Sequence, residues 1–135
     1  MGMSCQVETV KEEETYDAEG MIEALLRGER ELVLRTARKF AEQGVADAQV
    51  MMGVLYETGL GVPKNIEEAI AWYQKAAAQE HPTAWSNLGT IYLLGLHGQP
   101  DKEEAARCYG RAKLSRQKNG HNAQHFERAG GPSFF

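Results

Sequence analysis

Apolar residues near the start of the chain recur at the spacing of amphipathic helices. A short helix is predicted over residues 17–28, where the apolar positions at helical spacing are Met21, Ile22, Leu25 and Leu26. A second helix is predicted over residues 29–43, with an inward face made of Leu32, Val33, Thr36, Phe40 and Ala41. Glycines end both helices, as expected of a residue that favours helix C-termini.

Four further helices are expected, separated by turns that contain glycine and proline. They span residues 46–58, about 66–79, 83–94 and about 102–117. Asn65 and Asp101 stand where a side-chain oxygen caps the second and the fourth of these helices. A glutamate follows three residues after each cap, and we expect it to complete a reciprocal capping box.

The middle of the chain repeats itself at a distance of 36 residues without a gap. The coinciding pairs are Ala48/Ala84, Gly53/Gly89, Tyr56/Tyr92, Gly59/Gly95, Glu67/Glu103, Glu68/Glu104, Ala69/Ala105, Tyr73/Tyr109 and Ala76/Ala112. A fixed period of this size is typical of a stack of helical units. The sequence therefore predicts an all-α, right-handed solenoid of antiparallel helix pairs.

The solenoid is expected to occupy residues 16–130 as one domain. Its parts, with the flanking tails, are a flexible acidic tail (1–15), a degenerate first repeat (17–44), two clear repeats (46–81 and 82–117), a C-terminal capping helix (119–130) and a short tail (131–135). Terminal repeats are expected to be atypical, because one face of each has no neighbour.

Gly53 and Gly89 lie in the middle of predicted helices, where glycine is less favourable than alanine by about 1 kcal/mol. Close approach of the second helix of each repeat would offset this cost. In the first clear repeat, the small residues Ala69 and Ala76 are expected to face Gly53, with tyrosines filling the space beside them.

Residues 46–77 closely resemble the Sel1-like repeat, a relative of the tetratricopeptide repeat. The family pattern is Ala, then Leu-Gly, Tyr, Gly-x-Gly-Val, an acidic or Asn cap, Ala, Trp-Tyr and Ala-Ala; only Met52 replaces its Leu. The second copy departs from the pattern at His97-Gly98 and at Cys108, where Trp is usual. The resemblance implies an adaptor or scaffold that holds other proteins, often in bacterial signalling, secretion or envelope systems.

The composition of the chain argues against several classes of protein. Fifteen basic and 19 acidic residues give a formal net charge of −4, and the absence of a clustered basic face argues against nucleic-acid binding. No apolar run approaches the ~20 residues of a membrane span or forms a signal peptide. Cys5 and Cys108 are the only cysteines, so a disulfide framework is not expected. We therefore expect a cytoplasmic protein.

Candidate binding residues come from positions on the first helices of the repeats that packing does not explain. These positions are expected to line a concave groove that holds a protein or peptide partner. The candidates are Trp85, Leu93, Leu94, Val50, Val54, Glu57 and Thr90. An exposed tryptophan among apolar residues is a typical binding anchor. The alternative is that Trp85 packs against the C-terminal cap, for example on Phe126, and that the leucines belong to the core.

Enzymatic chemistry finds little support in the sequence. The carboxylate pairs Glu67-Glu68 and Glu103-Glu104 fall in first turns of helices, where capping and the helix dipole explain them. His121 and His125 have a zinc-like spacing but no third ligand. No catalytic residue, cofactor or metal is therefore predicted.

The sequence favours a non-enzymatic interaction module, such as an adaptor, a scaffold or a small inhibitor or immunity-type protein. One alternative is a hydrolase, because some cysteine-rich members of the family bind or hydrolyse β-lactams; those members carry paired cysteines in each repeat, which this chain lacks. Another alternative is a self-associating protein, because a short solenoid with apolar ends can form a homodimer end to end.

Overall fold

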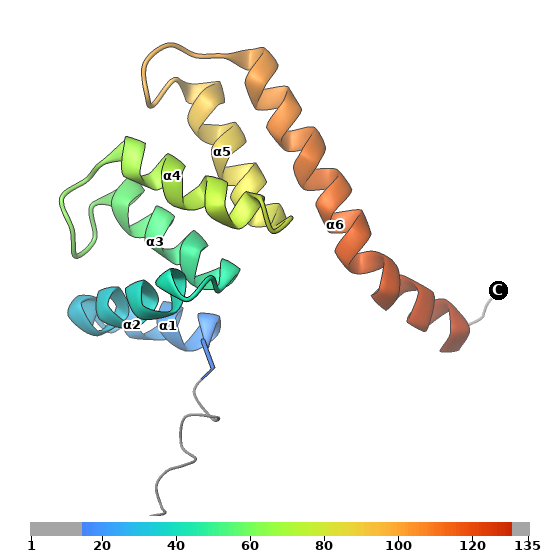
Figure 1. Cartoon of the computed structure of the whole chain (residues 1–135), viewed down its shortest axis with the longest axis horizontal. Coiled ribbons are helices and arrows are strands. Elements are labelled where there is room, and N and C mark those ends of the chain that lie inside the picture. Colours follow the sequence, from blue (N-terminus) through green and yellow to red (C-terminus); the bar gives the residue numbers. More distant parts are fainter. Residues whose placement is uncertain (1–14, 131–135) are drawn as a thin grey trace, which may run out of the picture.

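The computed structural model describes residues 15–130 of the chain, with the side chains of residues 15–119. The described part is helical throughout, apart from its turns (Figure 1). Its six helices are α1 (Ala18–Leu26), α2 (Arg30–Glu42), α3 (Ala46–Thr58), α4 (Ile66–Ala77), α5 (Pro82–Leu94) and α6 (Lys102–Gly130). The tails expected over residues 1–15 and 131–135 lie outside the described residues, apart from Thr15.

The helices form a solenoid in which each helix packs against the next along the chain (Figure 1). The pair α3 and α4 and the pair α5 and α6 have the most extensive contacts, and α4 packs on α5 to join them. The stack therefore consists of first helices (α1, α3, α5) and second helices (α2, α4, α6). This architecture confirms the all-α solenoid predicted from the sequence.

The last helix differs from the prediction. An end near Gln117 and a separate capping helix over residues 119–130 are expected from the sequence, but α6 continues without a break to Gly130. A single glycine such as Gly120 lowers helix stability by only about 1 kcal/mol. No proline, which would force an end, follows before Pro132.

Of the two hydrogen bonds predicted for each capping box, only the one accepted by the cap side chain is present. Asn65 Oδ1 accepts a hydrogen bond from the Glu68 N–H at 3.1 Å, and Asp101 Oδ1 accepts one from the Glu104 N–H at 3.0 Å. The prediction that each glutamate side chain accepts a hydrogen bond from the N–H of its cap residue is wrong. The N–H groups of Asn65 and Asp101 instead donate to the carbonyl oxygen of a tyrosine in the preceding helix, at 2.9 and 2.8 Å. Each cap therefore also ties the turn back to the first helix.

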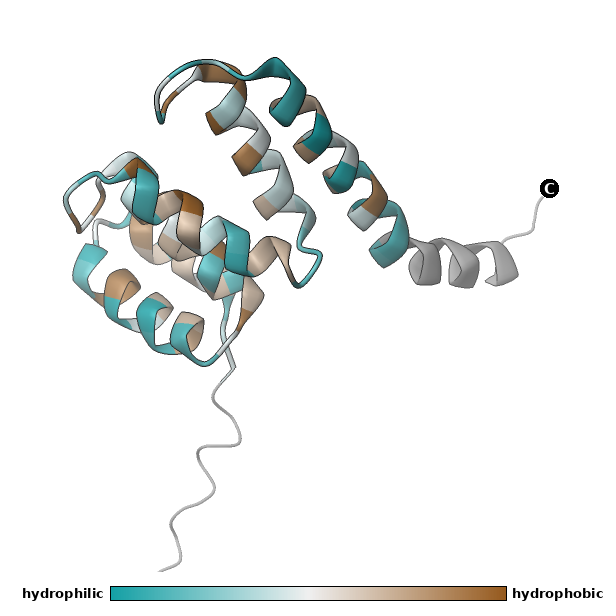
Figure 2. Cartoon of the chain, turned by 45° about the horizontal axis from the view of Figure 1, so that its top comes forward, coloured by the Kyte–Doolittle hydropathy of each residue, from teal (hydrophilic) through white to brown (hydrophobic). Residues whose placement is uncertain are grey.

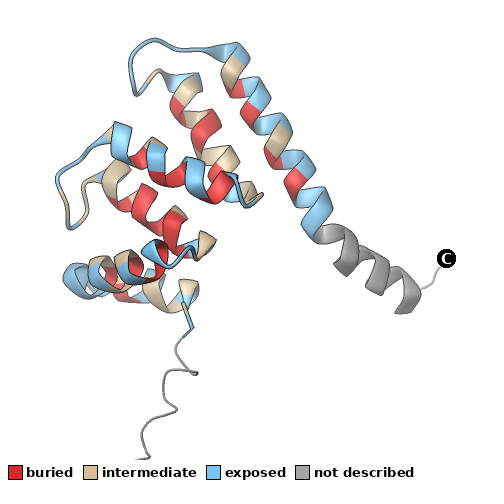
Figure 3. Cartoon of the chain, viewed as in Figure 1, coloured by how far each residue is buried: buried red, intermediate tan, exposed pale blue. Residues whose placement is uncertain are grey.

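Helix α4 supplies neighbouring aromatic residues to two parts of the core. Trp72 packs in a cluster with Phe40 and Met52 from α2 and α3. Tyr73 packs in a second cluster that includes Leu88 from α5. Neighbouring residues of a helix point in different directions, so α4 couples the two halves of the stack. Figure 3 shows the buried residues along α3, α4 and α5, where these helices face one another.

The inward face predicted for α2 is only partly right. Val33, Phe40 and Ala41 are buried, whereas Leu32 is 41% exposed. Among the described helices, α2 has its main contacts with α1 and α3. Leu32 therefore lies at the outer side of the stack, where no earlier helix pair covers it in the described part of the chain.

Gly53 and Gly89 each receive a tyrosine ring from the second helix of their own repeat. A Cβ atom at Gly53 would lie less than 3.0 Å from the Tyr73 ring, and one at Gly89 would lie 2.9 Å from the Tyr109 ring. The expected close approach of the two helices is confirmed, although tyrosine rather than alanine is the nearest group. Tyr73 is fully buried, whereas Tyr109 is 37% exposed.

This packing predicts opposite effects of alanine at three helical glycines. Gly53→Ala forces the buried Tyr73 ring to move and lowers the free energy of unfolding by about 1–3 kcal/mol. Gly89→Ala costs less, because the Tyr109 ring can shift toward solvent. Gly110→Ala, whose Cβ meets nothing within 4 Å, raises the free energy of unfolding by about 1 kcal/mol. Urea unfolding of the three variants measures these values, and a Gly53→Ala variant as stable as Gly110→Ala would contradict the packing account.

Candidate functional site

A groove of about 350 Å³ lies between the first helices of the solenoid. Its apolar wall consists of Ala18, Ile22 and Leu25 from α1 and Val50, Met51 and Val54 from α3. Its polar rim consists of Tyr16, Asp47, His81 and Thr83. This site is named the first-helix groove. Ile22 is apolar and yet 51% exposed, so the wall presents apolar surface to a ligand.

Asp47 and His81 connect two first helices at the rim of the groove. The Asp47 Oδ1 and His81 Nε2 atoms lie 2.6 Å apart. Asp47 belongs to the first turn of α3, and His81 is the residue that immediately precedes α5. The contact therefore holds the beginnings of successive first helices together and fixes this end of the groove.

Tyr16 closes the groove beside α1. Its ring packs on Phe40 with a centroid distance of 5.7 Å. Burial raises the pKa of Tyr16, and the negative charges of Asp47 and Asp17 add to this effect. The Tyr16 Oη and His81 Nδ1 atoms are buried and find no hydrogen-bond partner among the described residues. Because buried polar atoms are normally paired with protein, water or ligand, these two atoms offer unused hydrogen-bonding capacity beside the groove.

The four apolar candidates other than the tryptophan occupy two places. Val50 and Val54 line the first-helix groove. Leu93 and Leu94 lie at the C-terminal end of α5, where they are 41% and 59% exposed and outside the groove lining. The leucines therefore present apolar surface, but on a separate part of the molecule.

Glu57 and Thr90 are occupied by the tyrosines that fill the space against the glycines. Glu57 Oε1 accepts a hydrogen bond from the Tyr73 hydroxyl at 2.7 Å. Burial raises the pKa of Tyr73, and the bond to Glu57 raises it further. In the second clear repeat, Thr90 Oγ1 lies 2.8 Å from the Tyr109 hydroxyl. Glu57 thus helps to hold α4 in place, and Thr90 helps to hold α6 in place.

Trp85 lies in a different cavity, of about 210 Å³, between α4, α5 and α6. The guanidinium groups of Arg111 and Arg107 lie 4.7 and 5.9 Å from the centre of its ring, a favourable cation–π arrangement. Its side chain also packs against the second core cluster. The structure thus places Trp85 against the part of α6 that belongs to the second clear repeat, at Arg107, Cys108 and Arg111. The side chain of Phe126, on which the alternative interpretation packs Trp85, lies outside the described residues.

The two clear repeats carry their tryptophan on different helices. The first has Gln49 on its first helix and Trp72 on its second, and the second has Trp85 and Cys108 at the same positions. Trp85 and Cys108 line the same cavity, so a small residue on α6 leaves room for the ring from α5. Burial raises the pKa of the Cys108 thiol, as does the negative charge of Glu104, which keeps it a poor nucleophile.

Of the residues that line the groove, comparison of the repeats predicts only Val50 and Val54 as binding residues. Tyr16, Ile22 and Leu25 precede the clear repeats, and the degenerate first repeat gives no register to compare. The helical spacing of Ile22 and Leu25 was the available signal. His81 lies in the turn between repeats and meets Asp47 through space, which no local pattern indicates.

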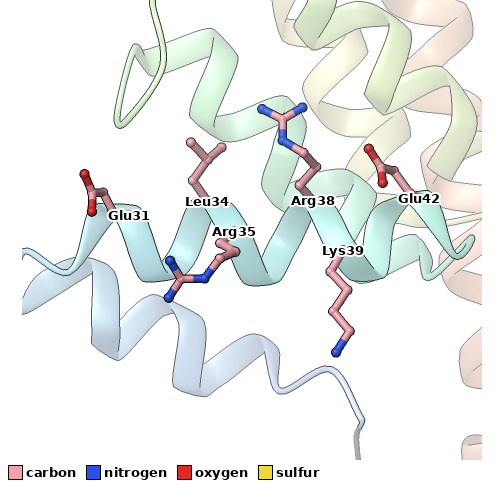
Figure 4. Close-up of a pocket in the computed structure, with 6 residues that line it drawn as sticks. All are labelled: Glu31, Leu34, Arg35, Arg38, Lys39 and Glu42. Atoms are coloured by element: carbon pink, nitrogen blue, oxygen red, sulfur yellow. The ribbon is translucent and has the colours of Figure 1, made fainter.

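A third hollow follows the surface of α2 (Figure 4). Figure 4 shows Leu34, Arg38 and Glu42 projecting to one side of the helix and Arg35 and Lys39 projecting to the other. All its lining residues come from this one helix, and all except Leu34 are charged, with both signs present. Charges of opposite sign spaced along one helix are typical of a solvated face, so this hollow is not taken as the functional site.

Metal and membrane sites find no support in the described part of the chain. No group of three or more metal-ligating side chains occurs among residues whose side chains are described. The side chains of His121 and His125 lie beyond those residues. No helix that the structure describes is both long and apolar enough to cross a membrane.

Comparison with known proteins agrees with the repeat geometry. The family model of the Sel1 repeat matches residues 46–81 and 86–114. A sel1-like repeat-containing protein of Acanthamoeba polyphaga mimivirus is 32% identical over 80 residues, which are 59% of this chain and 15% of that protein. The chain is a Sel1-like repeat protein. This finding confirms the resemblance seen in the sequence.

Further similar proteins come from a fungus and a bacterium. A chitin synthase regulator of Malassezia restricta is 40% identical over 55 residues, which are 41% of this chain and 4% of that protein. The crystal structure of a Sel1 repeat protein from Oxalobacter formigenes has a TM-score of 0.58 and 34% identity, over 62% of this chain and 34% of that one. The Sel1-like chain thus spans a small part of these proteins, and their range does not tie it to bacteria.

The position of Trp85 predicts a role in stability that the exposed leucines lack. Trp85→Ala removes a ring packed on the second core cluster and is expected to lower the free energy of unfolding by about 2–3 kcal/mol. Leu94→Ala, at a side chain 59% exposed, changes it by less than about 0.5 kcal/mol. Thermal unfolding of both variants tests this prediction, and equal losses would contradict the packing of Trp85 against the second core cluster.

Proposed function

We propose that this Sel1-like repeat protein is a non-enzymatic interaction module that binds one protein or peptide partner in the first-helix groove. Sel1 repeat proteins are generally modules for protein–protein interaction. The observation that carries the proposal is an apolar wall contributed by two helix pairs, with Ile22 51% exposed within it. Apolar side chains left open in a concave site are typical of a surface that a partner covers.

The polar groups around the wall support the same proposal. Thr83 and Asp47 lie at the rim and are exposed. An apolar centre with a polar rim is the usual anatomy of a protein interface. Val50 and Val54, which line the groove, are proposed to contact the partner. A module of this kind can act as an adaptor, a scaffold or a small inhibitor.

Self-association is the second candidate function. Leu93, Leu94 and Leu96 are all more than 40% exposed at the end of α5 and in the turn that follows. Apolar residues gathered in this way favour contact with another apolar surface, including that of a second copy. A hydrolase of the β-lactam type is not proposed, because the chain has two cysteines in all instead of a pair in each repeat.

Two substitutions on α1 test the groove directly. Ile22→Arg places a charge on the groove wall and is expected to weaken capture of a partner from an extract of the source organism by about tenfold or more. Leu26→Arg is the matched control, because Leu26 lies on the same helix, is 82% exposed and does not line the groove. A partner retained equally by both variants would contradict the proposal, provided both unfold at the temperature of the wild type.

A further inference from the structure

Charged residues are divided between the two sets of helices. No lysine or arginine occurs in α1, α3 or α5, whereas α2, α4 and α6 contain four, one and seven of the chain's 15. The first helices do carry carboxylates, namely Glu19, Glu23, Asp47 and Glu57. Figure 2 agrees, since α6 shows more of the strongly hydrophilic colour than α5. The helices that form the groove therefore have only negative charge.

Two of these carboxylates, those of Asp47 and Glu19, belong to the side of the first helices that carries the apolar wall. Asp47 lines the groove, bonds His81 through one oxygen, and still has a side chain that is 56% exposed. Glu19, which is exposed, lies three positions before Ile22 on α1. Residues three apart share a side of a helix. The apolar wall of the groove therefore has acidic side chains at its edge.

We propose that the partner segment held in the first-helix groove is a short stretch of apolar residues flanked by arginine or lysine. This inference rests on the proposed function and specifies the chemistry of its ligand. Apolar side chains of the segment cover Ile22, Val50 and Val54. A cationic side chain at its edge pairs with the exposed carboxylate of Asp47, since opposite charges at an interface favour association and select the partner.

The charge pattern disfavours the chain's own N-terminal residues as the occupant. Residues 1–14 contain four glutamates and one lysine. Their net charge has the same sign as that of the first helices, and like charges at a contact oppose it. The occupant is therefore a segment of another protein with the opposite charge.

The test uses three labelled peptides of equal length with identical leucine positions. Their remaining positions are all arginine, all glutamine or all glutamate. Fluorescence anisotropy with the full chain is expected to show the arginine peptide binding about tenfold tighter than the glutamine peptide, with the glutamate peptide weakest. Equal affinities, or tightest binding of the glutamate peptide, would overturn the inference.

Paired charge reversals separate a local effect of the groove from the overall charge of the protein. Asp47 and Glu67 are both exposed carboxylates in the first turn of a helix, but only Asp47 lines the groove. Asp47→Lys is expected to weaken binding of the arginine peptide about tenfold, whereas Glu67→Lys changes it less than twofold. Equal losses in the two variants would overturn the inference in favour of general charge attraction. Thermal unfolding of both variants confirms that each is folded.

The outcomes also separate this inference from the proposed function. If no peptide binds while Ile22→Arg still abolishes capture of a partner from the extract, the basic segment is wrong and the interaction module stands. If sedimentation shows that the captured partner is a second copy of the chain, the inference of a separate basic segment is overturned. If capture does not depend on Ile22, the groove itself is overturned.

Discussion

The contact of the Tyr73 ring with Gly53 is the constraint on which the rest of the stack depends. The ring is fully buried and leaves no room for a side chain on the facing helix. Its hydroxyl is fixed by Glu57 on that same helix, while the neighbouring Trp72 enters the other core cluster. One turn of α4 therefore sets the spacing of α3 and α4 and joins the first half of the solenoid to the second.

This use of α4 explains why the open apolar surface lies on the first helices. The second helices supply Trp72, Tyr73 and several of the buried alanines, and they carry all the lysines and arginines found in the six helices. The first helices also fill the core, with Met52, Leu55 and Ile91 among their buried side chains. Their positions that face the groove hold apolar side chains such as those of Val50 and Val54. Because the first helices contain no lysine or arginine, the groove between them has an apolar wall and acidic side chains but no lysine or arginine.

The fold was predictable from the sequence because its signals are local and repeated. Glycine in mid-helix at Gly53 and the cap at Asn65 each have one physical explanation, and the structure agrees with both. The site was less predictable, because it depends on contacts between segments. The failure of Trp85 to repeat predicts a place at the groove, but a change in how two helices pack against each other breaks the period equally well. The contact of Asp47 with His81 has no counterpart in any local pattern.

The most direct test of the account is a map of the surface that a ligand covers. Two-dimensional NMR of the isotope-labelled chain, titrated with the peptide of leucine and arginine, gives this map residue by residue. The account predicts that the largest shift changes fall on α1 and α3 around Ile22, Val50 and Val54, and at Thr83. Changes concentrated on α2 and α6, with the signals of Ile22 and Val54 unmoved, would contradict it.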